Sequence, residues 1–221
     1  MLPVTILVRQ SLTTSDVWRT LAAATGRPPR QVRERPLRGC LVAQGGCGFI
    51  FLDEDDPASI RFALAHELAH FAGHYLGKRE LAIARMGPSI APVLDGRRAP
   101  TAEERLGGIL SGCPLGTFTD VLEREGDSPL TPAAEAMEFE ADEVAFLALA
   151  PIGMVIAETL RRQGVVQSDS VVDTLTQAFG LSQRDARRHA PRILNAVQRS
   201  KPSLVDRLRE AASRTRGERH R

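Results

Sequence analysis

The segment with the most evident chemistry is His66-Glu67-Leu68-Ala69-His70, which has the pattern HExxH. On an α-helix, side chains four residues apart project from one face, so both imidazoles can reach a single metal ion. Zinc binds imidazole nitrogen at about 2.0–2.1 Å. Glu67 lies at the edge of that face, where it can take a proton from a water molecule that zinc activates. The pattern predicts a zinc centre with His66 and His70 as ligands and Glu67 as general base.

The helix that carries this pattern is expected to run from about Pro57 to Tyr75. Proline at its start, preceded by acidic residues, favours a helix N-terminus. Between residues 62 and 73, everything except the His-Glu-His trio is apolar or small, which is typical of a buried helix. Burying unpaired polar groups costs free energy. A bound metal would remove that cost, and the alternative is a pair of core histidines with local hydrogen bonds.

A catalytic zinc centre needs a third protein ligand, and the same helix does not supply it. His74 lies eight residues past His66, about 12 Å along the axis at the rise of an α-helix. The extended pattern HExxHxxGxxH would need a histidine at position 76, where this chain has Leu76. The third ligand is therefore expected from another element.

A second helix is expected from Pro132 to Ala150, with alanines along one face that let it approach another helix closely. Glu138 lies on that face, and we expect it to be the third ligand. Asp142, one turn later, is expected to accept the second imidazole N–H of a ligand histidine and so fix its orientation. Glu135 is the alternative ligand. Glu140 and Glu143 are expected to point the other way, into solvent.

Two stretches, 62–74 around HELAH and 138–151 with Glu138, Ala141 and Asp142, resemble the motif helices of the ImmA/IrrE family of metallopeptidases. The resemblance implies a zincin-like core of the gluzincin type with one Zn²⁺ per chain. It places zinc on His66, His70 and Glu138, with Glu67 as catalytic base and His74 as a packing or ligand-supporting residue. It also implies a protein substrate, a helix-turn-helix transcriptional repressor, cleaved as a stress or mobile-element switch.

The expected fold class is α+β and predominantly helical, with a small sheet next to the HExxH helix and a C-terminal helical extension. Residues 41–43 and 49–52 flank a Gly-rich turn and predict two strands. The expected division is a metallopeptidase domain over 1–165, with an insertion at about 77–131, and a helix-turn-helix-like segment over 166–221. Further helices are expected at about 16–25, 101–110, 152–163, 169–179, 182–198 and 202–214, with a turn or two at 119–125.

Composition supports an ordinary globular protein, with 43% hydrophobic and 25% charged residues. Three cysteines without CxxC spacing argue against a secreted disulfide framework. The uncharged run over 144–157, which is as long as any in the chain, is interrupted by Pro and Gly and is shorter than a membrane span. A cytoplasmic protein with no membrane partner is expected.

The chain ends in a basic segment, because residues 181–221 hold 12 Lys/Arg against 4 Asp/Glu. Residues 174–188 have a helix, Gly turn, helix pattern in which Arg184, Arg187 and Arg188 could contact phosphates. The alternative function is therefore a DNA- or protein-binding regulatory module in which zinc is only structural. In that case Glu67→Gln would leave the function intact.

Overall fold

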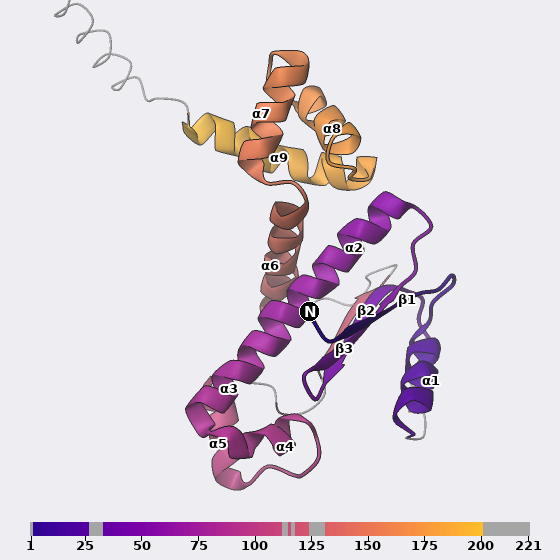
Figure 1. The fold of residues 1–221 in the computed structure, drawn as a ribbon, viewed down its shortest axis with the longest axis vertical. Helices are drawn as coiled ribbons and strands as arrows, with labels where there is room; N and C mark the ends of the chain where they lie inside the picture. Colours follow the sequence, from indigo (N-terminus) through magenta and orange to yellow (C-terminus); the bar gives the residue numbers. More distant parts are fainter. Residues whose placement is uncertain (1, 27–32, 112–114, 116–117, 124–130, 201–221) are drawn as a thin grey trace, which may run out of the picture. The chain divides into compact units, whose positions relative to one another are not determined.

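A computed structural model of the chain describes residues 2–26, 33–111, 115, 118–123 and 131–200. The fold is α+β and predominantly helical, with a small sheet, as the sequence predicted (Figure 1). Two compact units divide the chain, Met1–Leu149 and Ala150–Arg221. This division comes earlier than the expected boundary at residue 165, because the helix over Ile152–Gln163 packs on the two helices that follow it.

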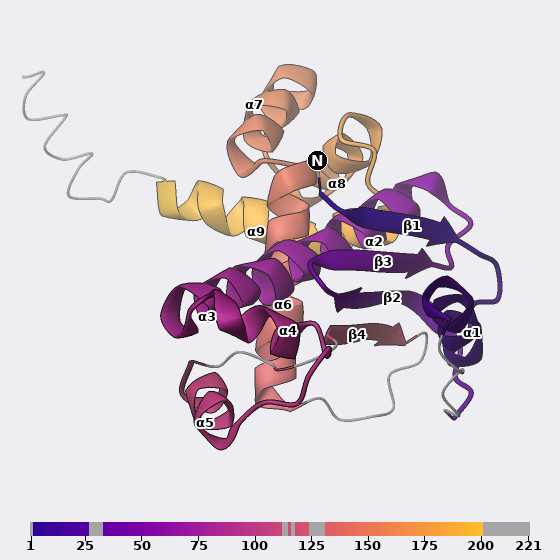
Figure 2. The same ribbon diagram turned by 60° about the horizontal axis from the view of Figure 1, so that its bottom comes forward.

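The first unit contains a four-stranded sheet in the order β1-β3-β2-β4, seen side by side in Figure 2. The strands are β1 (Val4–Val8), β2 (Leu37–Gln44), β3 (Cys47–Leu52) and β4 (Phe118–Glu123). β1 runs parallel to β3, whereas β2 is antiparallel to both β3 and β4. The β2–β3 hairpin turns at Gly45 and Gly46, whose φ angles of 63° and 81° are readily adopted by glycine.

The hairpin confirms the two predicted strands, but both outer strands differ from the sequence prediction. β1 was not predicted. β4 replaces the turn or two of helix expected at 119–125, because this segment pairs with the free edge of β2. Unpaired edge groups of a strand favour such pairing.

The HExxH helix starts where the sequence predicted but continues further. α2 (Pro57–Ala69) is followed directly by a π-helix, η1 (His70–Gly77), and then by α3 (Lys78–Met86). The Asp56 carboxylate caps α2 by accepting hydrogen bonds from the backbone N–H groups of Ala58 and Ser59. The π-helical segment contains two glycines, each of which weakens the preference for regular α-helix by about 1 kcal/mol.

Helices cover both faces of the sheet. Successive side chains of β2 point to opposite faces, so this strand contributes to the core on each side. On one face, α2 and η1 pack on a cluster formed by Leu41, Ala43, Ile50, Leu52, Ala63, Phe71 and Tyr75. On the other face, α1 (Thr14–Thr25) packs on a cluster formed by Leu12, Val17, Leu21, Leu37, Cys40, Val42 and Phe51. The phenol oxygen of Tyr75 accepts a hydrogen bond from Gly46 N at 2.7 Å, which ties η1 to the hairpin turn.

The described part of the expected insertion is largely helical. It contains η2 (Pro88–Ile90), α4 (Ala91–Leu94) and α5 (Ala102–Ser111), the last confirming the predicted helix. Thr101 and Glu104 form a capping box at its N-terminus. α6 (Pro132–Leu149) completes the unit and packs against α2, so the two predicted motif helices lie side by side.

The second unit consists, in its described residues, of α7 (Ile152–Gln163), α8 (Ser168–Gln177) and α9 (Gln183–Ser200). These confirm three predicted helices, whereas the helix expected at 202–214 lies outside the described residues. Across the described residues, no single helix is long and apolar enough to cross a membrane; α6 and α7, taken as a bent pair, meet that criterion by length and composition.

Candidate metal centre

Three side chains, one each from α2, η1 and α6, converge on one point of the first unit. The Nε2 atoms of His66 and His70 lie 3.1 Å apart. The Glu138 carboxylate approaches both, with Oε2 at 3.2 Å from His66 Nε2 and Oε1 at 3.4 Å from His70 Nε2. In the part of the chain that the structure describes, these three residues form the one group of this kind that could hold a metal ion.

The two histidine nitrogens are spaced as ligands of a small tetrahedral cation would be. Zinc bonded to nitrogen or oxygen at about 2.0–2.1 Å places neighbouring ligand atoms about 3.3 Å apart. The 3.1 Å between the two histidine Nε2 atoms is close to that value, and the contacts to Glu138 at 3.2 and 3.4 Å are made by different oxygens of its carboxylate. Two imidazoles with one carboxylate are also a ligand set that catalytic zinc centres use, leaving a fourth position for water or substrate.

Negative charge surrounds the first histidine. Burial opposes protonation of His66, but hydrogen bonds to the carboxylates of Asp142 and Glu138 outweigh it and raise the pKa to about 10. Burial likewise opposes ionisation of Glu138, yet its hydrogen bonds to His66 and His70 lower the pKa of that carboxyl to about 2. A cation at this position would therefore meet an ionised carboxylate and replace the proton shared by the group.

Asp142 orients His66 from behind. Its Oδ1 lies 3.0 Å from His66 Nδ1, and both side chains are buried. An ionised carboxylate can only accept hydrogen bonds, so Nδ1 carries the proton. In the neutral imidazole the lone pair is then on Nε2, the atom that faces Glu138. The structure thus places Asp142 where the sequence placed it, one turn beyond the proposed ligand.

His70 is oriented through a longer chain of hydrogen bonds. His70 Nδ1 lies 2.8 Å from His74 Nδ1, and His74 Nε2 lies 3.2 Å from Glu140 Oε2. With Glu140 as acceptor, His74 is protonated on Nε2 and accepts at Nδ1 from the Nδ1–H of His70. The lone pair of His70 is consequently on Nε2 as well, so both ligand atoms face the same point.

Glu140 is exposed to solvent, as the sequence predicted, but it also makes a contact that the sequence did not predict. Its side chain is 70% exposed, but its carboxylate reaches His74. The sequence did contain one indication that a further polar group would be found here, because His74 repeats the four-residue spacing of His66 and His70 and a buried histidine needs a hydrogen-bond partner. Glu135 is exposed and lies outside the ligand cluster.

Glu67 is fully buried on α2 next to the first ligand, and its negative charge adds to the raised pKa of His66. Tyr75, on the sheet side of η1, is bound to Gly46. The three arginines predicted as phosphate contacts, Arg184, Arg187 and Arg188, lie on α9 in the second unit and have exposed side chains.

Comparison of the chain with protein-family models, curated proteins and solved structures finds no match. The chemical interpretation of the centre accordingly rests on the types and positions of its side chains.

Proposed function

We propose that the protein is a zinc-dependent endopeptidase with a zincin-like, gluzincin-type core, similar to the ImmA/IrrE family. The observation that carries the proposal is the convergence of His66, His70 and Glu138, whose ligand atoms lie within 4.8 Å of one another and could hold one metal ion. Glu67, buried beside them, supplies the basic group that hydrolysis requires. The hydrogen bonds at the Nδ1 atoms of the two histidines add support. Bonds to the ring nitrogen that does not bind the metal fix the tautomer and orientation of zinc ligands.

In this proposal each residue has a separate task. Bound zinc supplies a Lewis acid that polarises the scissile carbonyl and lowers the pKa of water toward about 7. Glu67 accepts the proton from the attacking water and passes it to the nitrogen of the leaving amine. Asp142 and the His74–Glu140 pair keep the Nε2 lone pairs of the two histidines directed at the ion. Glu138 contributes the negative charge of the ligand set.

The substrate we propose is a protein, and specifically a helix-turn-helix transcriptional repressor in the cytoplasm. The support for this class is the sequence resemblance of the two motif helices. Hydrolysis of such a repressor would make the protein a switch for stress or mobile-element genes.

The experiment compares the zinc-loaded wild-type chain with Glu67→Gln on a peptide library whose products are identified by mass spectrometry. General-base catalysis contributes about 10²–10⁴ in rate, so Glu67→Gln should lose at least a hundredfold of the activity and keep its zinc. Glu143→Gln, on α6 and outside the cluster, is the matched control and should cleave like the wild type. If the wild-type chain cleaves nothing while binding zinc fully, the ion is structural and the proposal fails.

A further inference from the structure

The second unit contains two helices joined in a way that the peptidase proposal does not use. α8 ends at Gln177 and α9 begins at Gln183. Between them Gly180 adopts a φ of 64°, and the Leu181 N–H returns to Leu175 O at 3.1 Å. The Ser182 hydroxyl caps α9 by accepting from Asp185 N at 3.1 Å. Two packed helices joined by a short glycine-containing turn form a helix-turn-helix arrangement.

α9 has two chemically distinct sides. Its inward side consists of residues that are almost fully buried: Ala186, His189, Ala190 and Ile193. Its outward side begins with three exposed arginines, Arg184, Arg187 and Arg188. Positions three and four residues apart share a helical face, so these side chains form one cationic surface near the start of the helix.

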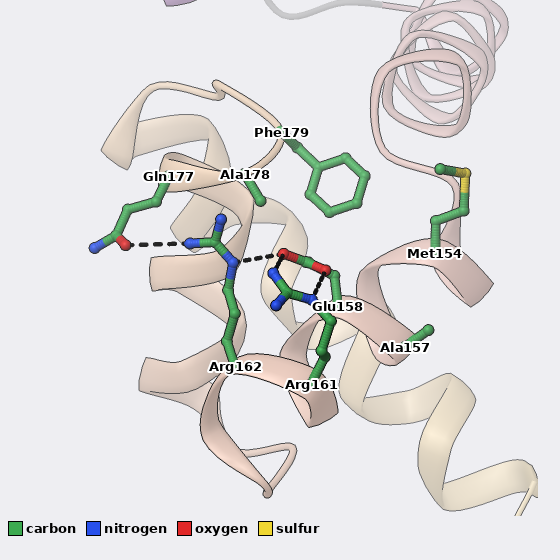
Figure 3. A pocket seen from close by; sticks show the side chains of 8 residues that line it. All are labelled: Met154, Ala157, Glu158, Arg161, Arg162, Gln177, Ala178 and Phe179. Carbon is green, nitrogen blue, oxygen red and sulfur yellow. Dashed lines mark hydrogen bonds and ion pairs between the residues drawn. The ribbon is translucent and has the colours of Figure 1, made fainter.

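The exposed side of α9 carries no acidic residue. The acidic residue of α9 is Asp185, which is buried and accepts a hydrogen bond from the Ser182 hydroxyl at 2.6 Å. On α7 the opposite holds, because Arg161 and Arg162 both bind the Glu158 carboxylate at 2.6 Å (Figure 3). The two arginines of α7 are therefore held in ion pairs with one glutamate, whereas the exposed side of α9 that carries the three arginines has no acidic residue.

We propose that the second unit binds duplex DNA, with the exposed side of α9 in the major groove. That groove is about 12 Å wide and admits an α-helix. In helix-turn-helix proteins the first part of the second helix makes the contacts, which is where Arg184, Arg187 and Arg188 lie. Gln183 and Asn195 are exposed on α9 as well, and their amides can pair with adenine edges. This inference is independent of the metal centre.

The test measures binding of the full-length chain to a fluorescein-labelled 20-base-pair DNA duplex by anisotropy, at a series of KCl concentrations. The variant is Arg184→Gln/Arg187→Gln. The matched control is Arg161→Gln/Arg162→Gln, which removes the same charge from the same unit. Each phosphate contact contributes about 0.9 to the slope of log affinity against log salt. The α9 variant should lose about tenfold in affinity at 100 mM salt and flatten the slope by about 2, and the control should retain both.

An RNA duplex of the same length and sequence serves as competitor, because its narrow major groove does not admit a helix. It should compete more weakly than DNA. Equal loss in both arginine variants, equal competition by RNA, or no binding by the wild-type chain at low salt would each overturn the proposal. A Glu138→Gln variant should bind DNA like the wild type, so failure of the metal site and failure of this inference are distinguishable.

Discussion

Removing the Asp142 carboxylate should weaken metal binding without removing a ligand. Asp142 Oδ1 accepts from His66 Nδ1 at 3.0 Å, and the residue is only 5% exposed, so water would replace it poorly in Asp142→Ala. Hydrogen-bond partners behind a metal ligand typically contribute 10–100-fold to metal affinity. We expect a loss near the upper end, about 2–2.7 kcal/mol at 1.4 kcal/mol for each factor of ten. Asp142→Asn, which keeps a neutral acceptor, should lose less.

The assay is competition for zinc between the protein and a chromophoric chelator, with circular dichroism to establish that each variant is folded. Glu140→Ala is the comparison variant, because this carboxylate is 70% exposed and reaches His70 only through His74. Exposed pairs of this kind contribute about 0–1 kcal/mol, so its loss should stay within about fivefold. A folded Asp142→Ala protein with wild-type zinc affinity, or a larger loss in Glu140→Ala, would refute the reasoning.

Three further predictions concern the fold and the metal-free state. A Cβ on Gly48 would lie 2.9 Å from two ring carbons of the buried Phe71, so Gly48→Ala should lower the free energy of unfolding by about 1–3 kcal/mol, measured in urea; an unchanged midpoint would contradict this. In the metal-free protein the pKa of His66 is about 10, so its stabilisation is complete below about pH 6.5 and is lost as pH rises toward 10; the free energy of unfolding should fall over this range, and more steeply than in Asp142→Asn. Zinc at about 100 times its Kd should stabilise the wild-type chain by about 2.7 kcal/mol, seen as a rise in Tm that Glu138→Ala lacks; equal rises would count against the site.

The central residues of the candidate metal centre could be predicted from sequence because local spacing determines them. His66 and His70 share a face on any helix, and the apolar residues around them indicate that the helix is buried. Glu138 and Asp142 could be selected for a similar reason, since they lie one turn apart on a face rich in alanine. The remaining requirement for the cluster was that the two helices pack against each other, and the structure shows that they do.

Glu140 could not be found in this way. Two residues past Glu138, it is rotated by about 200° around the helix axis, which predicts a solvent-facing side chain. Its contact with His74 depends on how α6 lies along η1 and on the π-helical geometry of that segment. Both are tertiary features that periodicity does not encode.

The outer strands of the sheet were missed for a related reason. β1 and β4 are short, and each pairs with a strand distant in sequence. Their pairing is set by the free edges of the β2–β3 hairpin rather than by local propensity. The hairpin itself was predictable because its glycine turn and both strands are contiguous.

The most direct test of the account is the metal content of the purified full-length chain beside that of Glu138→Ala, measured by inductively coupled plasma mass spectrometry after dialysis. The account predicts one zinc per wild-type chain and a greatly reduced content in the variant, because the three-ligand set is then reduced to two histidines. A wild-type chain without zinc would contradict the metal centre itself. Zinc retained in full by Glu138→Ala would contradict the assignment of the third ligand.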